Sequence, residues 1–121
     1  MIRGLGIDMI EVDRVAARIA KEQGFRELVF SPREIAYCES KAHPAEHYAA
    51  RFAAKEAFLK ALGTGWAGGV AFHEIEVLPD EKGSPQVHLS GVTAEKAGES
   101  RILVSLTHLK MLASAVIIIE K

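Results

Sequence analysis

Cysteine, net charge and long apolar runs are all scarce in this 121-residue sequence. The single cysteine, Cys38, excludes an internal disulfide and a multi-cysteine metal site, and it suits a reducing cytosol. A formal net charge of −1 provides no overall field that would draw the chain to a nucleic acid. The longest apolar run, 115–119, is far shorter than the roughly 20 residues that cross a bilayer. We therefore expect no nucleic-acid partner and no membrane partner.

The beginning of the sequence also lacks the features of a secretory signal. Residues 1–4 contain no charged segment, long apolar core or small-residue cleavage site, so we expect a cytoplasmic protein. The composition, with 49% hydrophobic and 26% charged residues, is typical of soluble globular proteins. A chain of this length suits one domain, which we expect to cover residues 1–121.

The first half of the sequence predicts one strand followed by helices. Residues 4–10 form a short apolar run that predicts a buried strand, and the next apolar residues fall at helical spacing until Gly24. Ser31 is followed by proline and, three positions on, by glutamate, which predicts a capped helix that ends near Ser40. Residues 45–62 contain no glycine or proline and predict the longest helix.

The second half of the sequence predicts mainly strands. Residues 72–78 and 86–89 suit two strands around a turn, and 92–99 suit a short helix. Residues 101–108 and 113–120 are apolar and rich in branched side chains, which predicts a hairpin. Short connections cannot make parallel crossovers, so we expect an α+β fold in which the long helix packs on a mostly antiparallel sheet.

Asp8 is the one charged residue within the first predicted strand. A carboxylate among leucine, isoleucine and methionine is costly to bury unless it is paired, hydrogen-bonded or bound to a metal. One hypothesis makes Asp8 a metal ligand, and the other makes it a cap for the helix that follows at Glu11. The spacing of the residues does not decide between them.

One face of the longest predicted helix combines a ring, a carboxylate and an ammonium group. Phe52, Glu56 and Lys60 recur every four residues and therefore share a face. A surface ion pair between Glu56 and Lys60 would account for the pattern. The helix also runs into the glycine loop 63–65, and a carboxylate, cations and exposed backbone together suit a polyphosphate with a metal ion. Neither a P-loop nor a dinucleotide-binding glycine pattern is present.

Two further features are less specific. His108 ends a predicted strand, where its ring could bond to a ligand phosphate or close a turn. A basic ridge of three residues, Arg14, Arg18 and Lys21, lies beside Phe25. This ridge is either a solvated face or a docking surface for an acidic helical partner, for which Phe25 would be the apolar anchor.

Several longer motifs point to one family. The first runs from Gly6-Ile7-Asp8 through Glu11 to Arg14, and the second is Arg51-Phe52-Ala53-Ala54-Lys55-Glu56-Ala57-Phe58-Leu59-Lys60. Shorter motifs follow at 61–65, 75–77, 83–85 and 105–108. In residues and in order, these motifs resemble the bacterial holo-acyl-carrier-protein synthases, the small phosphopantetheinyl transferases. The resemblance covers essentially the whole chain and implies the 4'-phosphopantetheinyl transferase fold.

The resemblance implies a metal site and a reaction. Asp8 and Glu56 correspond to the family's magnesium ligands and are, with Lys60, the implied catalytic residues. In the implied reaction, a carrier-protein serine attacks the β-phosphate of coenzyme A, which transfers 4'-phosphopantetheine and releases adenosine 3',5'-bisphosphate. Magnesium would polarise the diphosphate, Lys60 would stabilise or protonate the leaving phosphate, and Glu56 or a water on the metal would accept the serine proton.

The same resemblance implies the binding partners. The coenzyme A site is expected to be lined by Lys60, Gly63, Gly65, Pro85 and His108. Arg51 or Lys41 would meet the ribose phosphate. Family members of this length are trimers with active sites between subunits, so a homotrimer is implied. The basic ridge, with Phe25, corresponds to the surface that meets the acidic acyl carrier protein.

Two other functions would use the same residues. A non-enzymatic module would bind coenzyme A or a carrier protein and leave both unchanged. A magnesium-dependent hydrolase of coenzyme A or a nucleotide would use the carboxylates to activate water in place of a serine. A gain in the mass of the carrier protein distinguishes transfer from both alternatives.

Overall fold

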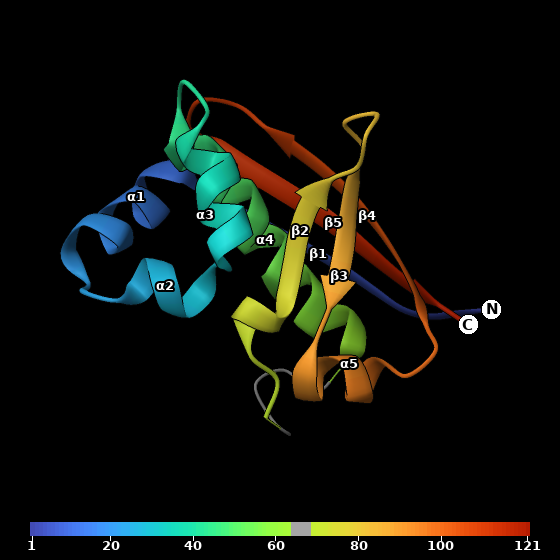
Figure 1. The fold of residues 1–121 in the computed structure, drawn as a ribbon. Coiled ribbons are helices and arrows are strands. Elements are labelled where there is room, and N and C mark those ends of the chain that lie inside the picture. Colours follow the sequence, from blue (N-terminus) through green and yellow to red (C-terminus); the bar gives the residue numbers. More distant parts are fainter. Residues whose placement is uncertain (64–68) are drawn as a thin grey trace.

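The computed structural model describes residues 1–63 and 69–121. Its elements, in chain order, are β1 Ile2–Glu11, α1 Val12–Lys21, α2 Phe25–Val29, α3 Pro32–Glu39, α4 Pro44–Leu62, the 3-10 turn η1 Phe72–Glu74, β2 Ile75–Pro79, β3 Pro85–Leu89, α5 Gly91–Ala97, β4 Arg101–His108 and β5 Leu112–Glu120. One antiparallel sheet has the strand order β1-β5-β4, and β2 pairs with β3 in a second antiparallel sheet. In Figure 1, α4 lies between the strands and the helices α1 to α3. The predicted α+β fold is confirmed.

Two local predictions need correction. Residues 72–78 were expected to form one strand, but 72–74 form the turn η1, and the strand begins only at Ile75. The short helix α2 was not predicted, and it begins after Gly24, whose φ of 83° is left-handed. No helix in the described ranges 1–63 and 69–121 is long and apolar enough to cross a membrane.

Two glycines allow β1 to lie directly on α4. A Cβ atom added to Gly4 would lie 1.9 Å from the carbonyl oxygen of Ala61, and one added to Gly6 would lie 1.9 Å from that of Ala57. Alternate residues of a strand point to the same side, so Asp8 faces the helix as these glycines do. The contact between strand and helix is therefore backbone against backbone, and it brings Asp8 close to α4.

The opposite side of β1 is apolar and exposed. Leu5, Ile7 and Met9 are 65%, 63% and 65% exposed. The strand lies at the edge of its sheet, and α4 covers only the glycine side. The prediction of a buried strand is therefore wrong for this side of β1 in a single chain.

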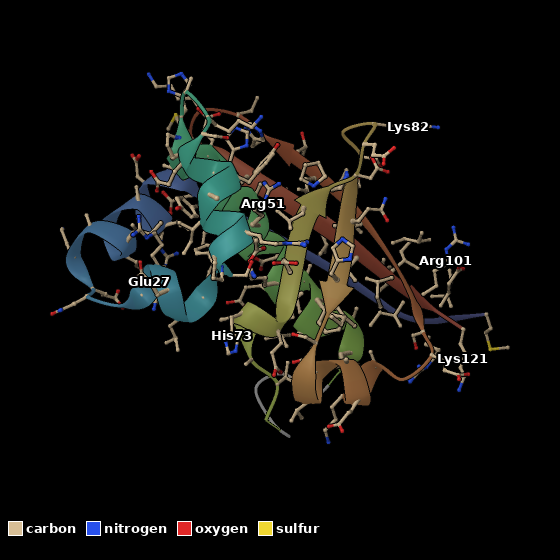
Figure 2. All side chains as sticks on the ribbon, viewed as in Figure 1. Glu27, Arg51, His73, Lys82, Arg101 and Lys121 are labelled. Atoms are coloured by element: carbon tan, nitrogen blue, oxygen red, sulfur yellow. The ribbon has the colours of Figure 1, made fainter. Side chains whose placement is uncertain are left out.

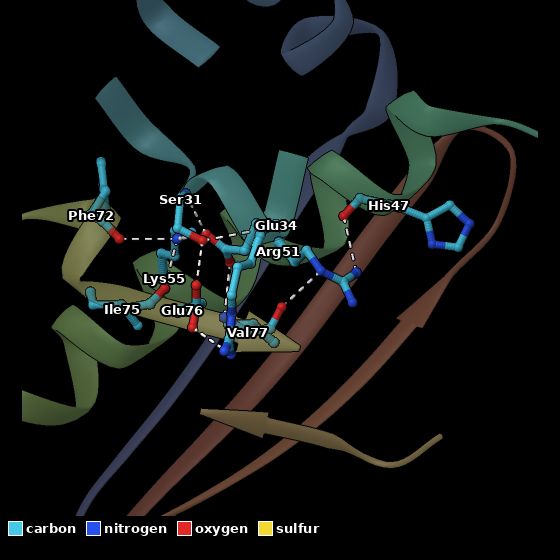
Figure 3. Close-up of polar contacts among 10 residues, drawn as sticks. Ser31, Glu34, His47, Arg51, Lys55, Phe72, Ile75, Glu76 and Val77 are labelled. Atoms are coloured by element: carbon cyan, nitrogen blue, oxygen red, sulfur yellow. Dashed lines mark hydrogen bonds and ion pairs between the residues drawn. The ribbon is translucent and has the colours of Figure 1, made fainter. Parts of the chain in front are cut away.

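A buried ion pair joins α3, α4 and β2. Lys55 and Glu34 have fully buried side chains, and Lys55 Nζ donates to Glu34 Oε1 at 2.7 Å and to the carbonyls of Phe72 at 3.0 Å and Ile75 at 2.6 Å (Figure 3). Glu34 also accepts from the backbone N–H of Val77 at 2.8 Å. Burial lowers the pKa of Lys55, and the charge of Glu34 opposes that shift. Although Lys55 directly precedes Glu56 in the motif, its role is to hold β2 and η1 on α4.

We expect Gly6→Ala to destabilise the chain by about 2 kcal/mol, because the added methyl group overlaps the Ala57 carbonyl and forces β1 away from α4. Urea denaturation measures the loss. Gly83→Ala is the matched control, since no described atom lies within 4 Å of the added Cβ and the left-handed φ of 85° is what opposes the substitution. That conformation costs about 1 kcal/mol. Equal losses in the two variants would contradict the close backbone contact.

Candidate active site

Asp8 of β1 and Lys60 of α4 form an ion pair. Lys60 Nζ lies 3.0 Å from Asp8 Oδ1 and donates to the carbonyl of Ile7, also at 3.0 Å. The side chain of Asp8 is 18% exposed, and that of Lys60 is 56% exposed. The ammonium group is thus held at a fixed place on the strand while it remains accessible to an anion.

These contacts decide between hypotheses that the sequence left open. The N-cap residue of α1 is Glu11, which makes no side-chain capping bond, and the Asp8 carboxylate bonds to Lys60. The hypothesis that Asp8 caps this helix is therefore wrong. Lys60 pairs with Asp8 across the fold, and the described ion pairs do not include the simple surface pair of Glu56 with Lys60.

Glu56 is half-buried and close enough to Asp8 for their charges to interact. Burial raises the pKa of Glu56, and the Asp8 carboxylate raises it further, whereas Lys60 and Arg18 lower it. Glu56 lies one helical turn before Lys60 on α4, so the three side chains converge. The strand and the helix together bring two carboxylates and one ammonium group into one site.

The donor set at this site fits magnesium. The two carboxylates repel each other, and a divalent cation between them would relieve that repulsion. Magnesium takes one or two protein carboxylates and fills its other positions with water and phosphate oxygens. Within residues 1–63 and 69–121, no group of three or more histidine, cysteine, aspartate or glutamate side chains could hold a metal. Asp8 and Glu56 are therefore the candidate ligands.

Gly63 ends α4 next to this site. Its φ of 82° is left-handed, its N–H donates to the carbonyl of Leu59 at 3.0 Å, and no described atom lies within 4 Å of an added Cβ. The described residues thus leave the Cβ side of Gly63 uncovered. Gly65, which was predicted to line the same site, lies outside the described residues. Pro85 is the first residue of β3 and is partly exposed.

His108 lies near the other end of α4. Its Nδ1 is 3.0 Å from Oε1 of Glu46, which lies in the first turn of the helix. The ring centroids of His108 and His47 are 5.2 Å apart. Glu56 is ten residues further along α4 than Glu46, which corresponds to about 15 Å. A single chain therefore does not bring His108 to the carboxylate site.

Arg51 is enclosed within the fold. Its side chain lies between α3 and β2, in contrast to Lys82 and Arg101, which project into solvent (Figure 2). The guanidinium donates to the carbonyls of Val77 at 2.9 Å and His47 at 3.4 Å (Figure 3). Its carbon atom Cζ also lies 4.4 Å from the ring centroid of Tyr37. These contacts give Arg51 a structural role that links α4 to β2.

The basic ridge is exposed on α1, but its expected apolar anchor is not. Phe25 is only 6% exposed, because its ring packs against Phe52 with centroids 6.1 Å apart and the Arg18 guanidinium covers it at 4.2 Å. The prediction of Phe25 as an exposed anchor is therefore wrong. Leu28, on α2, is 70% exposed and is the accessible apolar side chain nearby in the sequence.

Glu46 is the partner of a predicted site residue, His108, and the sequence did not reveal this contact. Its contact with His108 spans 62 positions. A glutamate in the first turn of a helix is ordinary, because it faces the positive end of the helix dipole. No local pattern distinguishes Glu46 from such a residue.

Comparison with known proteins identifies the family. Residues 4–114 match the family model described as the 4'-phosphopantetheinyl transferase superfamily. The chain is 42% identical over 125 residues to the holo-[acyl-carrier-protein] synthase of Geotalea daltonii, with both proteins covered completely. It is 46% identical over 124 residues to that of Syntrophus aciditrophicus, which covers 99% of this chain and 97% of the relative.

Solved structures agree in fold. The holo-[acyl-carrier-protein] synthase from Neisseria meningitidis superposes with a TM-score of 0.88 at 32% identity, over 100% of both chains. The Bacillus anthracis synthase, solved in complex with CoA (3',5'-ADP), gives a TM-score of 0.85 at 35% identity, over 100% of this chain and 98% of the other. The chain therefore belongs to the 4'-phosphopantetheinyl transferase superfamily, as an enzyme of the holo-[acyl-carrier-protein] synthase type.

Proposed function

We propose that this enzyme transfers 4'-phosphopantetheine from coenzyme A to a serine of an apo acyl carrier protein, with magnesium, and releases adenosine 3',5'-bisphosphate. The observation that carries the proposal is the convergence of Asp8, Glu56 and Lys60 at the contact between β1 and α4. The relatives' shared name and the coenzyme A complex of the Bacillus anthracis synthase support the two substrates.

In this proposal Asp8 and Glu56 hold the magnesium ion, which would polarise the diphosphate of coenzyme A when bound. Lys60, fixed by the Ile7 carbonyl and by Asp8, lies one turn before Gly63 at the end of α4. Its ammonium group stabilises the negative charge that develops on the leaving phosphate. Among the described residues, none covers the Cβ side of Gly63, which supports a place for the diphosphate beside Lys60.

The transfer step forms one bond and breaks one. The serine oxygen bonds to the β-phosphorus, and the bond from that phosphorus to the bridging oxygen breaks. Adenosine 3',5'-bisphosphate leaves with the electron pair. The serine proton would go to the Glu56 carboxylate or to a water held at the metal site.

We propose that the coenzyme A site also includes Gly65, Pro85 and His108, and that it lies between subunits of a homotrimer. Glu46, the partner of His108, lies about 15 Å along α4 from Glu56. This distance supports a site in which one subunit provides the carboxylates and another provides His108. Lys41, whose Nζ lies 4.6 Å from the ring centroid of Tyr37, is available for the ribose phosphate. The proposal omits Arg51, whose buried guanidinium already donates to two backbone carbonyls.

The assay that tests the function measures the mass of an apo carrier protein after incubation with the chain, coenzyme A and magnesium. We expect a gain of one phosphopantetheine.

Asp8→Asn and Glu56→Gln are expected to lower the rate on the order of 100-fold or more, because each removes a charge at the diphosphate site. Glu95→Gln, on an exposed position of α5, is the control and should not change the rate. An unchanged carrier mass with the parent chain, or bisphosphate release without carrier, would refute the proposal.

The fold of Glu56→Gln is checked by its melting temperature. A carboxyl group whose pKa is raised by folding adds stability at low pH, and this stability is lost as the pH rises through the raised pKa. Without metal, the ionised Glu56 is therefore unfavourable at neutral pH. We expect Glu56→Gln to melt at or above the temperature of the parent at pH 7, with the difference vanishing near pH 4. A lower melting temperature at pH 7 would mean that lost activity reflects lost structure.

The exposed side of β1 supports the homotrimer. Leu5, Ile7 and Met9 form an apolar surface of the kind that another subunit covers. Light scattering should give about three times the 13.2 kDa chain mass, and Ile7→Glu should lower it to one chain. Leu28→Glu, at a similarly exposed residue of α2, is the control and should remain a trimer. A parent chain that is already monomeric would contradict the assembly.

We propose that the basic ridge binds the acidic carrier protein. Arg18 is tied to Glu22 at 2.9 Å and also influences Glu56, so Arg14, which forms no ion pair with any described residue, gives the cleaner test. Arg14→Glu is expected to weaken carrier binding on the order of tenfold and to reduce its salt dependence, without changing coenzyme A binding. Lys96→Glu on α5 is the charge-matched control. An equal loss of affinity for carrier and coenzyme would argue against this surface.

A further inference from the structure

A carboxylate of α4 holds the ring of His108. Oε1 of Glu46 lies 3.0 Å from Nδ1 of His108, and the side chains are 19% and 33% exposed. His108 is the last residue of β4, and Glu46 lies in the first turn of α4, so the contact ties a strand end to a helix start. A partly shielded bond of this length restricts the rotation of the ring.

The contact also sets which nitrogen of the ring faces outward. An ionised carboxylate only accepts hydrogen bonds, so Nδ1 of His108 keeps its proton and donates it in a hydrogen bond to Glu46. Nε2 lies on the other side of the ring, away from Glu46. When Nε2 also takes a proton, it becomes a charged donor for an anion, and the Glu46 carboxylate balances the charge of the ring.

His47 supports the same ring without competing for the proton. The two rings meet edge to face at an angle of 63°. Burial lowers the pKa of His47, and the charges of His108, Arg51 and Lys41 lower it further, whereas the Glu46 carboxylate raises it. These effects favour the neutral form of His47 beside the His108 ring.

We infer that Glu46 is a positioning residue that holds His108 with Nδ1–H toward α4, so that Nε2 faces a phosphate group of coenzyme A. The inference rests on the proposed function in one respect, namely that His108 lines the coenzyme A site. It goes further because Glu46 acts through His108 and does not touch the ligand. A carboxylate behind a histidine fixes both its orientation and its protonated nitrogen.

A double-mutant cycle tests whether Glu46 acts through His108. Glu46→Gln keeps the shape of the side chain and removes its charge, and His108→Gln removes the ring. Calorimetry with coenzyme A and magnesium chloride should show about a tenfold higher Kd for Glu46→Gln, which corresponds to about 1.4 kcal/mol. In the His108→Gln background the same change should leave the Kd unaltered. Glu95→Gln, on α5, is the charge-matched control and should bind as the parent does.

Nitrogen-15 NMR of the His108 ring detects the contact between His108 and Glu46 in the absence of any ligand. The parent should show a proton on Nδ1, and Glu46→Gln should move the proton balance toward Nε2. Equal losses of affinity with and without the His108 ring, or an unchanged ring spectrum in Glu46→Gln, would overturn the inference.

Failure of the proposed function gives a different result. A chain that binds coenzyme A but leaves the carrier mass unchanged refutes transfer. In that case the double-mutant cycle, which measures the affinity for coenzyme A, still supports or refutes the role of Glu46. A parent chain that does not bind coenzyme A overturns both proposals.

Discussion

The candidate site depends on the direct contact between the backbones of β1 and α4. Because Gly4 and Gly6 have no side chains, the strand comes within reach of the helix carbonyls, and Asp8 is carried to the side of α4 that holds Glu56. Lys60 completes this arrangement by bonding both to the strand backbone and to Asp8. Gly4 and Gly6 are therefore as necessary to the site as its carboxylate, although they carry no chemistry.

Local patterns in the sequence predicted the elements whose causes are local. The capping box of α3 is present with both of its bonds, from Ser31 and from Glu34, and the apolar segments near the end form the hairpin of β4 and β5. Residues 72–74 were wrongly predicted as strand, and the carbonyl of Phe72 there accepts a hydrogen bond from Lys55, which lies on a helix distant in the sequence. The burial of Phe25 likewise depends on Phe52. Contacts between distant segments decide these features. The spacing of apolar residues along the sequence therefore cannot predict them.

The same limit applies to the site. Asp8 and Glu56 could be singled out from the sequence because a carboxylate in an apolar strand and a mixed helix face are unusual, and because their motifs resemble a known family. The bonds of Arg51 to backbone carbonyls show that a basic residue in the same motif can serve the fold instead. Glu46 has an ordinary place in the sequence, and only its contact with His108 gives it significance.

The strand order has a consequence for how the chain folds during synthesis. β5, the last strand in the sequence, lies in the middle of its sheet, between β1 and β4. Until β5 leaves the ribosome, β1 has no strand partner among the described elements, and both of its backbone edges stay open to other chains. Such long-range pairing slows folding. The central place of β5 therefore makes the sheet complete only when its two most distant segments have paired.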